Sequence, residues 1–312
     1  MRYQNISIVI PTFNGKKLLE KYLSSIINAC KNYSFGKTEL IVVDDASNDG
    51  TANYLKLNFP LVKVIRQDTN EGFSVSVNKG IFSSKNEITV LLNNDVEIQN
   101  NFLSFFPQCF EDENVFAVRP ALENSLEDKI IKNTNIAGGF KYGFFDVPKV
   151  TKKELKFAFF SGGGASAYDK KKFVELGGFD EIFAPFYYED VDLSYRAWKR
   201  GWKIVYEPRS SAYHMGGTTI SKHFSAGYIN IISQRNKYFL VWKNITDDWL
   251  LLKHFVFIPI IIMLNLIKGN FDCLFGFLKA IKAVKKIIKK RKHERKFVKI
   301  SDQEIFDKFK EN

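Results

Sequence analysis

The first half of the chain alternates short apolar runs with stretches of helical periodicity. Apolar, mostly β-branched runs at residues 6–10, 40–43, 62–65, 88–92 and 115–118 predict buried strands. Between the first two runs, apolar residues recur three and four positions apart from Leu18 to Ile27, which predicts a helix with one face packed on a sheet. Strands and helices that alternate in this way are typical of an α/β fold with a mostly parallel sheet.

A further helix is predicted in the segment EDVDLSYRAWKRG. It should begin near Tyr188, because acidic residues occupy the first turn, and end before Gly201. Asp192 and Arg196 lie four positions apart on this helix and are expected to pair. A short apolar strand over residues 203–206 should follow.

Polar residues stand where three of the predicted strands end. Thr12 follows the first strand, Asp45 the second and Asp95 the fourth. Ligands of open α/β sheets bind outside the carboxyl ends of the strands, so these positions predict one shared site. Ordinary turn chemistry is the alternative, and we favour it for residues 47–49, which precede Gly50.

Composition adds a strongly uneven charge distribution. The chain has 312 residues, a mass of 36.0 kDa and 45% hydrophobic residues, as expected of a globular protein. Of the formal net charge of +12, residues 279–299 contribute +10. A nearly neutral body with a basic tail predicts an anionic partner for the tail and argues against a nucleic-acid groove across the fold. Three distant cysteines and a start that lacks signal-peptide features predict a cytosolic setting.

The tail also carries apolar segments that predict contact with a membrane. Residues 255–267 number only 13, about 20 Å of helix against ~30 Å of hydrocarbon, which favours a segment lying in the interface over one that spans it. From Leu274 to Ile288, apolar residues recur at helical spacing among lysines. We therefore predict that residues 255–299 bind an anionic membrane surface. A terminal helix docked on the protein with a solvated charged face is the alternative.

Six segments in a fixed order carry a resemblance to a known family. They are IVIPTFN (8–14), LIVVDDASNDGT (40–51), NEGFSVSVNKGI (70–81), LLNNDVEI (91–98), GGFDEIFAPFYYEDVDLSYRAWKRGW (177–202) and YHMGGTT (213–219). The chain resembles family 2 glycosyltransferases, and among them the bacterial rhamnosyltransferase-like branch. The resemblance implies a GT-A fold in residues 1–245, with a Rossmann-like sheet flanked by helices, and inverting transfer from a nucleotide-diphosphate sugar. Residues 246–312 would form a helical membrane-associating extension.

The resemblance also implies a site for Mn²⁺ or Mg²⁺. Asp95 takes the last position of the family's Asp-x-Asp motif, whereas Asn93 stands where the first acid is expected. Such hard cations bind oxygen ligands, and Mg²⁺ takes few of them from protein, so one carboxylate beside the diphosphate would suffice. His214 matches a position that completes the metal shell in some relatives, and imidazole suits Mn²⁺ better than Mg²⁺. A loop histidine without a metal is the alternative.

The segment YYED is implied to supply the catalytic base. Inverting transfer needs one base, which removes the proton of the acceptor hydroxyl while the oxygen attacks the anomeric carbon. Asp190 matches the second acid of the family's Glu-Asp motif and is the candidate base, with Glu189 beside it. Alternatively, both acids only stabilise a helix N-terminus, each by ~0.3–1 kcal/mol.

For the nucleotide, the resemblance implies contacts from several of these strand ends. Phe13 would lie against the base and Asp45 would accept its imide N–H, a group that uracil and thymine share, so UDP and dTDP both fit. Asn78 would line the diphosphate or sugar, and Gly163 would border the donor sugar and the acceptor. The predicted nucleotide-binding residues are Pro11, Thr12, Phe13, Asn14, Asp45, Asn78, Asn93, Asn94 and Asp95.

These features predict a metal-dependent glycosyltransferase, peripheral on the cytoplasmic face of the cell membrane. It would move a sugar from a UDP- or dTDP-sugar to a cell-surface glycan that is lipid-linked, with no nucleic-acid partner. A catalytically inactive, membrane-bound scaffold is an alternative, because Asn93 departs from the family pattern. A sugar nucleotidyltransferase is a weaker one, since PTFNGKKLL lacks the Gly-rich basic signature expected near the first strand.

Overall fold

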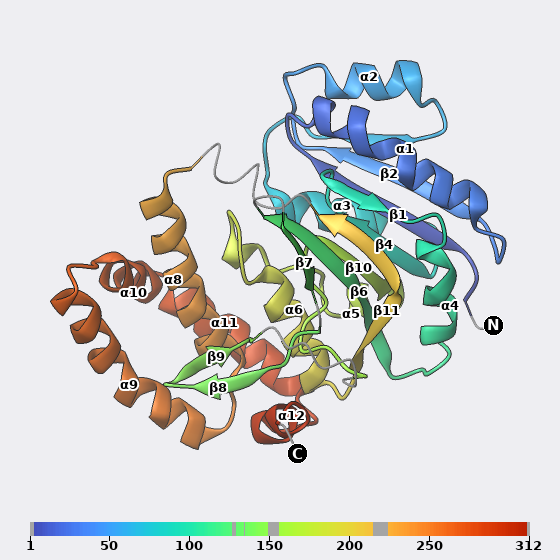
Figure 1. The fold of residues 1–312 in the computed structure, drawn as a ribbon. Coiled ribbons are helices and arrows are strands. Elements are labelled where there is room, and N and C mark those ends of the chain that lie inside the picture. The colour runs from blue at the N-terminus through green and yellow to red at the C-terminus, as the bar shows by residue number, and fades with distance from the viewer. Residues whose placement is uncertain (1–2, 127–128, 134, 149–155, 215–223, 311–312) are drawn as a thin grey trace.

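The computed structural model describes residues 3–126, 129–133, 135–148, 156–214 and 224–310. A nine-stranded sheet forms the centre of the molecule, and the C-terminal helices gather beyond one end of it (Figure 1). The strands follow the order β3-β2-β1-β4-β10-β6-β11-β5, with β7 paired to β6, and β8 and β9 form a separate hairpin. Residues 215–219 of the YHMGGTT segment lie outside the described residues.

The strands and helices have the following bounds. The strands are β1 (Ile6–Thr12), β2 (Thr38–Asp44), β3 (Lys63–Arg66), β4 (Ile88–Leu92), β5 (Val96–Ile98), β6 (Val115–Leu126), β7 (Lys129–Asn133), β8 (Gly139–Lys141), β9 (Phe144–Asp146), β10 (Ala165–Asp169) and β11 (Lys203–His214). The α-helices are α1 (Lys16–Asn32), α2 (Thr51–Asn58), α3 (Phe73–Ser83), α4 (Phe106–Cys109), α5 (Lys170–Glu175), α6 (Glu189–Lys199), α8 (Ala226–Asn244), α9 (Asp248–Ile267), α10 (Asp272–Lys282), α11 (Val284–Glu294) and α12 (Asp302–Asp307). Short 3-10 helices are η1 (Phe102–Phe105), η2 (Glu181–Phe183) and η3 (Arg295–Phe297).

The predicted fold class is confirmed. Strands β3, β2, β1 and β4 are parallel, and each of the five predicted strands is present. Beyond β4 the sheet is mixed, because β10 lies between β4 and β6 and runs antiparallel to both. Strand β3 is more exposed than its sequence predicts, since Lys63 and Arg66 face solvent at the edge of the sheet.

Both faces of the parallel strands are buried. In β1, Ile8 and Ile10 pack in a cluster with Leu23 of α1, whereas Val9 packs in another with Val77 of α3. Successive side chains of a strand point to opposite faces, so a strand covered on both sides reads as a continuous apolar run. This burial holds the strand ends, and the polar residues that follow them, at one edge of the sheet.

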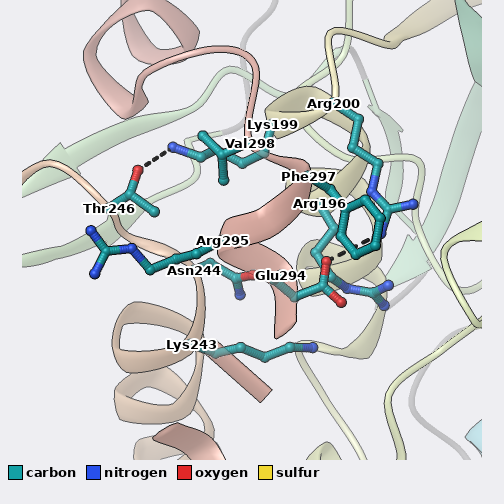
Figure 2. Close-up of a pocket in the computed structure, with 10 residues that line it drawn as sticks. All are labelled: Arg196, Lys199, Arg200, Lys243, Asn244, Thr246, Glu294, Arg295, Phe297 and Val298. Carbon is teal, nitrogen blue, oxygen red and sulfur yellow. Dashed lines mark hydrogen bonds and ion pairs between the residues drawn. The ribbon is translucent and has the colours of Figure 1, made fainter. Parts of the chain in front are cut away.

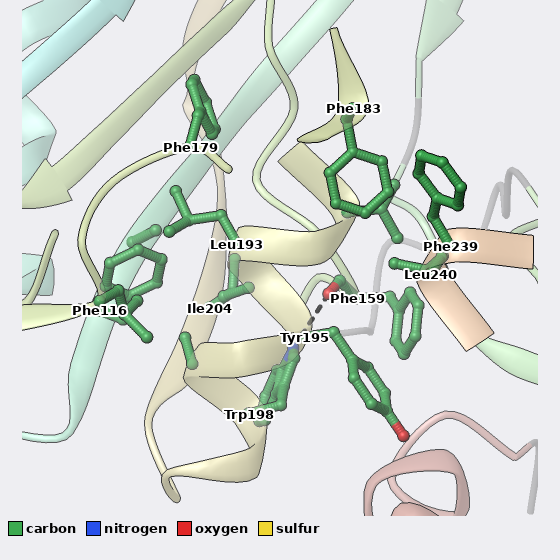
Figure 3. Close-up of a cluster of buried hydrophobic side chains, with 14 of the residues drawn as sticks. Phe116, Phe159, Phe179, Phe183, Leu193, Tyr195, Trp198, Ile204, Phe239 and Leu240 are labelled. Carbon is green, nitrogen blue, oxygen red and sulfur yellow. Dashed lines mark hydrogen bonds between the residues drawn. The ribbon is translucent and has the colours of Figure 1, made fainter. Parts of the chain in front are cut away.

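The apolar cluster that contains Val9 and Val77 also fixes the helix that begins at Glu189. Figure 3 shows Tyr195 and Trp198 of α6 packed among aromatic side chains, with the indole N–H of Trp198 donating to the carbonyl of Phe159 at 3.0 Å. The predicted pair is also confirmed, since Nε of Arg196 lies 2.8 Å from Oδ2 of Asp192, both buried. The N-terminus of α6 is therefore held rigidly relative to the sheet.

The chain beyond residue 245 returns to α6 instead of ending in free solvent. The carboxylate of Asp302 is buried and accepts from Nζ of Lys199 (2.8 Å), the hydroxyl of Tyr195 (2.5 Å) and the backbone N–H of Asp247 (2.7 Å). Figure 2 shows the cavity between these parts, lined from α6, α8 and η3, with room for about one water molecule at ≈ 10 Å³. This cavity is far too small for a nucleotide.

The tail forms different helices from those the sequence predicts. Helix α9 has 20 residues where the apolar run predicts 13, because it begins at Asp248, and the amphipathic stretch is broken at Ala283 into α10 and α11. With a mean hydropathy of 2.3 in its most apolar window, α9 is the one helix among the described residues that is long and apolar enough to cross a membrane. One stripe of α9, including Leu250, His254 and Ile258, is buried against the protein.

Candidate functional site

The carboxyl ends of β1, β2 and β4 meet at one place. Nδ2 of Asn94 donates to Oγ1 of Thr12 at 2.8 Å, which links the ends of β4 and β1. The backbone N–H of Asp45 donates to the carbonyl of Thr12 at 2.9 Å, which links β2 to the same point. Pro11 is buried within β1, and Phe13 is half-buried directly after it. The structure therefore brings together the predicted residues of three strand ends.

The turn residues after β2 behave as the sequence predicts. The backbone N–H of Asn14 donates to Oγ of Ser47 at 2.8 Å, and Oδ1 of Asn14 accepts from the backbone of Asn48 at 2.9 Å. Asp49 accepts from the backbone N–H groups of Lys16 and Thr51, at 3.0 and 3.1 Å. These bonds hold the first two strand-to-helix loops against each other.

Asp45 already has several protein partners. Its Oδ1 accepts from Nε2 of Gln67 (2.5 Å) and the backbone N–H of Glu71 (2.7 Å), and its Oδ2 accepts from the N–H of Gly72 (2.8 Å). A carboxylate offers about four lone-pair sites, so about one is left for a ligand. Asp45 therefore holds the loop before α3 in place. The remaining lone pair could still accept a hydrogen bond from a base.

Asn78 binds the backbone of a distant loop. Its side-chain amide is buried and exchanges two hydrogen bonds with the backbone of Phe179, at 2.9 and 2.8 Å. These bonds use one of its two amide hydrogens and one lone pair of its oxygen. Asn78 thus holds the loop at residues 177–181 against α3, a glycine at 178 leaves room for it, and its contact with the donor stays a prediction.

Asp95 and His214 form the predicted pair. In the sheet, His214 at the end of β11 is paired in register with Val96 of β5, the residue after Asp95. Nε2 of His214 lies 3.1 Å from Oδ1 of Asp95, and Nδ2 of Asn93 lies 3.4 Å from the same nitrogen. Strand β11 extends eight residues beyond the predicted 203–206 and so carries the histidine to this place.

This pair fits a divalent cation that takes the rest of its ligands from elsewhere. Oδ1 of Asp95 is buried and makes no hydrogen bond within the described part of the chain, because the 3.1 Å contact with His214 lacks hydrogen-bond geometry. Two ligand atoms about 2.1 Å from an octahedral ion and at right angles to each other lie about 3 Å apart, close to the separation of Asp95 and His214. No group of three or more His, Cys, Asp or Glu side chains that could hold a metal occurs among the described residues. Diphosphate oxygens and water would have to complete the shell.

Asp190 lies at the N-terminus of α6, with its carboxylate largely enclosed. Oδ1 accepts from the backbone N–H of Val191 at 2.8 Å. Burial raises the pKa of Asp190 above its ordinary value, and the N–H of Val191, the charge of Arg119 and the N–H of Gly163 oppose this rise. The helix N-terminus therefore does not dominate, and Asp190 is a stronger base than an exposed aspartate.

A run of three glycines connects the candidate base to the candidate metal pair. A methyl group placed on Gly163 would lie 3.7 Å from Oδ2 of Asp190, and one on Gly164 would lie 3.3 Å from Cε1 of His214. Consecutive Cα atoms are about 3.8 Å apart, so both side chains face the same short stretch of backbone. Asp190 and His214 thus lie next to adjacent residues of this loop, and His214 in turn lies next to Asp95.

Arg119 of β6 is a residue of this site that the sequence analysis did not identify. Its side chain is buried, Nη1 donates to the carbonyl of Ser161 at 3.1 Å, and a methyl group on Gly162 would lie 2.7 Å from Nη1. Nε has no partner within the described ranges. A buried cation beside Asp190 favours the ionised carboxylate that a base requires. No local motif marks Arg119, because its contacts with Ser161 and Gly162 depend on how β6 packs under the glycine run.

Glu189 is buried with Oε2 unpaired in the described structure, and it provides a test by pH. Burial, with the neighbouring charge of Asp190, raises the pKa of Glu189 to about 8. The folded state then holds a proton that the unfolded state releases near its ordinary pKa, so Glu189 lowers stability as pH rises from about 4.5 to about 8. Each pKa unit is worth about 1.4 kcal/mol.

Glu189→Gln should therefore be more stable than the wild type at pH 8 and gain little at pH 4. Urea unfolding of both proteins at the two pH values measures the difference. Glu181→Gln, an exposed acid on η2, is the control and should show no such pH dependence. An equal effect of Glu189→Gln at both pH values would contradict the assigned environment.

Comparison with known families gives one match. A family described as Glycosyl transferase family 2 matches residues 7–176, more than half of the chain. Among curated proteins, the chain is 30% identical over 185 residues to the GalNAc(5)-diNAcBac-PP-undecaprenol beta-1,3-glucosyltransferase of Campylobacter jejuni, covering 57% of this chain and 55% of that protein. The chain spans between 24% and 55% of the length of the first curated relatives that it matches.

Solved structures support the fold. GalNAc-T7, crystallised with UDP, GalNAc and Mn²⁺, superposes with a TM-score of 0.61 at 21% identity, over 77% of this chain and 49% of that one. S. aureus TarS 1–349 in complex with UDP-GlcNAc superposes with a TM-score of 0.60 at 15% identity, over 97% of this chain and 89% of that one. At these identities the likeness concerns the fold alone.

Proposed function

The chain belongs to glycosyl transferase family 2, and from this premise we propose that it transfers a sugar from a nucleotide-diphosphate donor to a glycan acceptor with inversion at the anomeric carbon. One observation carries the proposal. Asp190 lies next to Gly163, and His214, which is paired with Asp95, lies next to Gly164, so we propose that one bound donor lies between them. We also propose that the chain belongs to the rhamnosyltransferase-like branch of the family, because six of its segments resemble the motifs of that branch.

A pyrimidine nucleotide is the proposed donor, as UDP or dTDP. UDP or UDP-GlcNAc is bound in the GalNAc-T7 and TarS structures, which supports this choice. In this chain, Phe13 and Asp45 would receive the base, and Thr12 with Asn94 would lie beside the sugar and phosphates. Asp45 would accept the imide N–H with the lone pair that its three protein partners leave.

Asp95 and His214 are proposed to hold Mn²⁺ or Mg²⁺, with Asn93 next to them. When bound, such a cation supplies positive charge that neutralises the diphosphate as it leaves. The GalNAc-T7 structure contains Mn²⁺, which supports a divalent ion but does not decide between the two metals. Asp190 is proposed to accept the proton of the acceptor hydroxyl, and Arg119 to keep Asp190 ionised until then.

Asp95→Ala should abolish the part of donor binding that depends on metal. Removing the carboxylate leaves one protein ligand, and the ion then loses its link to the sheet. Thermal unfolding of the wild type should shift upward when UDP and Mn²⁺ are added together, because a ligand that binds only the folded state stabilises it. The variant should shift no further with Mn²⁺ than without it.

Glu97→Ala is the matched control, because Glu97 lies two positions further on and is exposed. It should behave as the wild type does in the same titration. An undiminished shift with UDP and Mn²⁺ in Asp95→Ala would contradict the metal assignment. Absence of any nucleotide release from UDP- and dTDP-sugars by the wild type would instead favour the inactive scaffold.

We propose further that the protein is peripheral on the cytoplasmic face of the cell membrane, and that α9 to α11 bind the anionic surface. One stripe of α9 is docked: His254 accepts from the indole of Trp242 at Nε2 (2.8 Å), and its Nδ1 lies 2.6 Å from the carbonyl of Gly143. The opposite stripe is exposed, with Trp249 at 69% and Ile267 at 74%. A helix docked along one side suits a position in the interface.

In this proposal, some basic side chains of the tail face the lipid and others bind the protein itself. Lys279, Lys282, Lys285, Lys286 and Lys289 are exposed on α10 and α11. Lys290 instead lies 2.8 Å from Asp180, and Arg291 donates to the carbonyl of Trp242 at 3.0 Å. Both predicted arrangements thus have support, since the tail is docked on the protein and still offers an apolar and basic outer face.

The combined variant Phe255→Glu and Ile267→Glu should bind phosphatidylglycerol vesicles at least about tenfold more weakly, because each apolar side chain gains about 1.5–3 kcal/mol on burial. Leu61→Glu, at a leucine near β3 that is more exposed than either of them, should leave binding unchanged. Binding of the wild type should weaken as salt is raised. Sedimentation with vesicles measures all three, and full binding by the charged variant would exclude this face.

A further inference from the structure

We propose that four aromatic residues, Phe186, Tyr187, Phe224 and Tyr228, form a platform on which a sugar ring of the acceptor glycan stacks. This inference rests on the proposed function and names a part of the acceptor site. We call the four residues the aromatic platform. None of them belongs to the candidate residues for the nucleotide, the metal or the base.

The aromatic platform is built in two layers. Phe224 and Tyr228 are stacked with ring centroids 5.4 Å apart and an interplanar angle of 18°. Both meet the ring of Phe186 edge-on, at 5.1 and 6.4 Å, and Tyr187 meets it from another side at 5.0 Å. Phe186 is buried, whereas Tyr187, Phe224 and Tyr228 are 40%, 38% and 38% exposed. The outer rings therefore present surfaces to solvent and are backed by a buried ring.

The platform is held in place from α8. Nδ2 of Asn236, which is fully buried, lies 2.9 Å from each of the carbonyl oxygens of Phe183, Phe186 and Tyr187, so these three acceptors share its two hydrogens. These bonds fix a loop in which Tyr187 and Tyr188 both have left-handed backbone, with φ of 72° and 75°. Bulky residues adopt this conformation only when the surroundings impose it, and such strain collects at functional sites.

The same loop leads directly into the candidate base. Tyr187 precedes Asp190 by three residues, so their Cα atoms are at most roughly 11 Å apart. We infer that an acceptor whose hydroxyl reaches Asp190 passes over this loop. Its next sugar would then lie over exposed rings, whose negatively charged faces attract the C–H groups of a pyranose.

A sugar explains the platform better than a bilayer does. The exposed apolar surface of α9 and α10 combines aliphatic side chains with lysines, as expected for lipid. The platform instead combines rings with hydroxyl groups on Tyr187 and Tyr228, and Arg235 of α8 is anchored beside it on the carbonyl of Ala184 at 2.5 Å. Rings with polar groups at their rim suit a ligand with apolar faces and hydroxyl edges.

A printed array of bacterial and mammalian glycans, probed with the full chain, tests the proposal. The wild type should retain a set of glycans, and Phe224→Ala and Tyr228→Ala should each bind them about twofold to tenfold more weakly. Tyr228→Phe, which keeps the ring, should stay close to the wild type. Phe35→Ala, at a similarly exposed ring before β2, is the matched control and should not change binding.

Three results would contradict the proposed role of the aromatic platform. It is overturned if the wild type retains no glycan, if both alanine variants bind as well as the wild type while folded by thermal unfolding, or if their loss appears on phosphatidylglycerol vesicles instead of glycans. Release of nucleoside diphosphate from UDP- and dTDP-sugars by the wild type, without acceptor, is measured in parallel. That release tests the proposed transferase function by itself, so the two failures can be told apart.

Discussion

Asp190→Asn is expected to lower the kcat of sugar transfer by about 10²–10⁴-fold, the usual contribution of a positioned general base. Asparagine keeps the shape of the side chain but cannot take up the proton of the acceptor hydroxyl. Donor affinity should change little, because the base contacts the acceptor. Initial rates at saturating donor, with UDP release as the signal, measure the change.

The stability of Asp190→Asn provides an independent check. Burial raises the pKa of Asp190, so the ionised carboxylate costs free energy in the folded state. The amide lacks that charge, and the variant should unfold at the same or a higher temperature than the wild type at pH 8. A lower kcat with an unchanged unfolding temperature would indicate a catalytic role for Asp190. A lower unfolding temperature together with the lower kcat would indicate that Asp190 only caps the helix.

Asp302→Ala is expected to destabilise the protein by about 3–5 kcal/mol, the usual effect of removing one partner of a buried ion pair. Lys199 is left with Thr246 as a neutral partner, and the N–H groups of Thr246 and Asp247 lose their acceptor. Urea unfolding measures the change. The effect should be large although Asp302 lies ten residues from the C-terminus and far from the strand ends.

Asp307→Ala supplies the matched control on the same short helix. Its partner Lys310 is exposed, and exposed pairs are worth about 0–1 kcal/mol. If Asp302→Ala were as mild as this control, the tail would be an appendage and the predicted boundary at residue 245 would separate two independent parts. Otherwise, deletion of the tail would damage α6, and point variants on α9 are the better test of membrane binding.

The parallel strands and their polar ends could be predicted from sequence because the determinants are local. A run such as residues 88–92 is apolar throughout, and a strand buried on both faces requires that pattern. Asp95 and His214 were identified through motifs, and the structure brings them together through the pairing of β11 with β5. Their roles remain part of the proposal.

The other features depend on contacts between distant segments. The amide of Asn78 binds a backbone 101 positions away, which no spacing in the sequence reveals. Arg119 lies close enough for its charge to act on Asp190 because β6 brings it to the backbone at residues 161 and 162. The break between α10 and α11 could not be predicted either, because no proline marks it and the helical spacing of apolar residues continues across Ala283.

The salt bridges of Asp180 fix the position of the tail relative to the candidate site. Lys243 of α8 and Lys290 of α11 both bind Asp180, at 2.6 and 2.8 Å, in the loop that leads toward α6. Within the described part of the chain, these two ion pairs therefore tie the tail directly to the segment that leads to the candidate base. If a bilayer holds the tail, the height of the centre above the lipid is a fixed property of the protein, and only acceptors whose reactive hydroxyl stands at that height would be elongated.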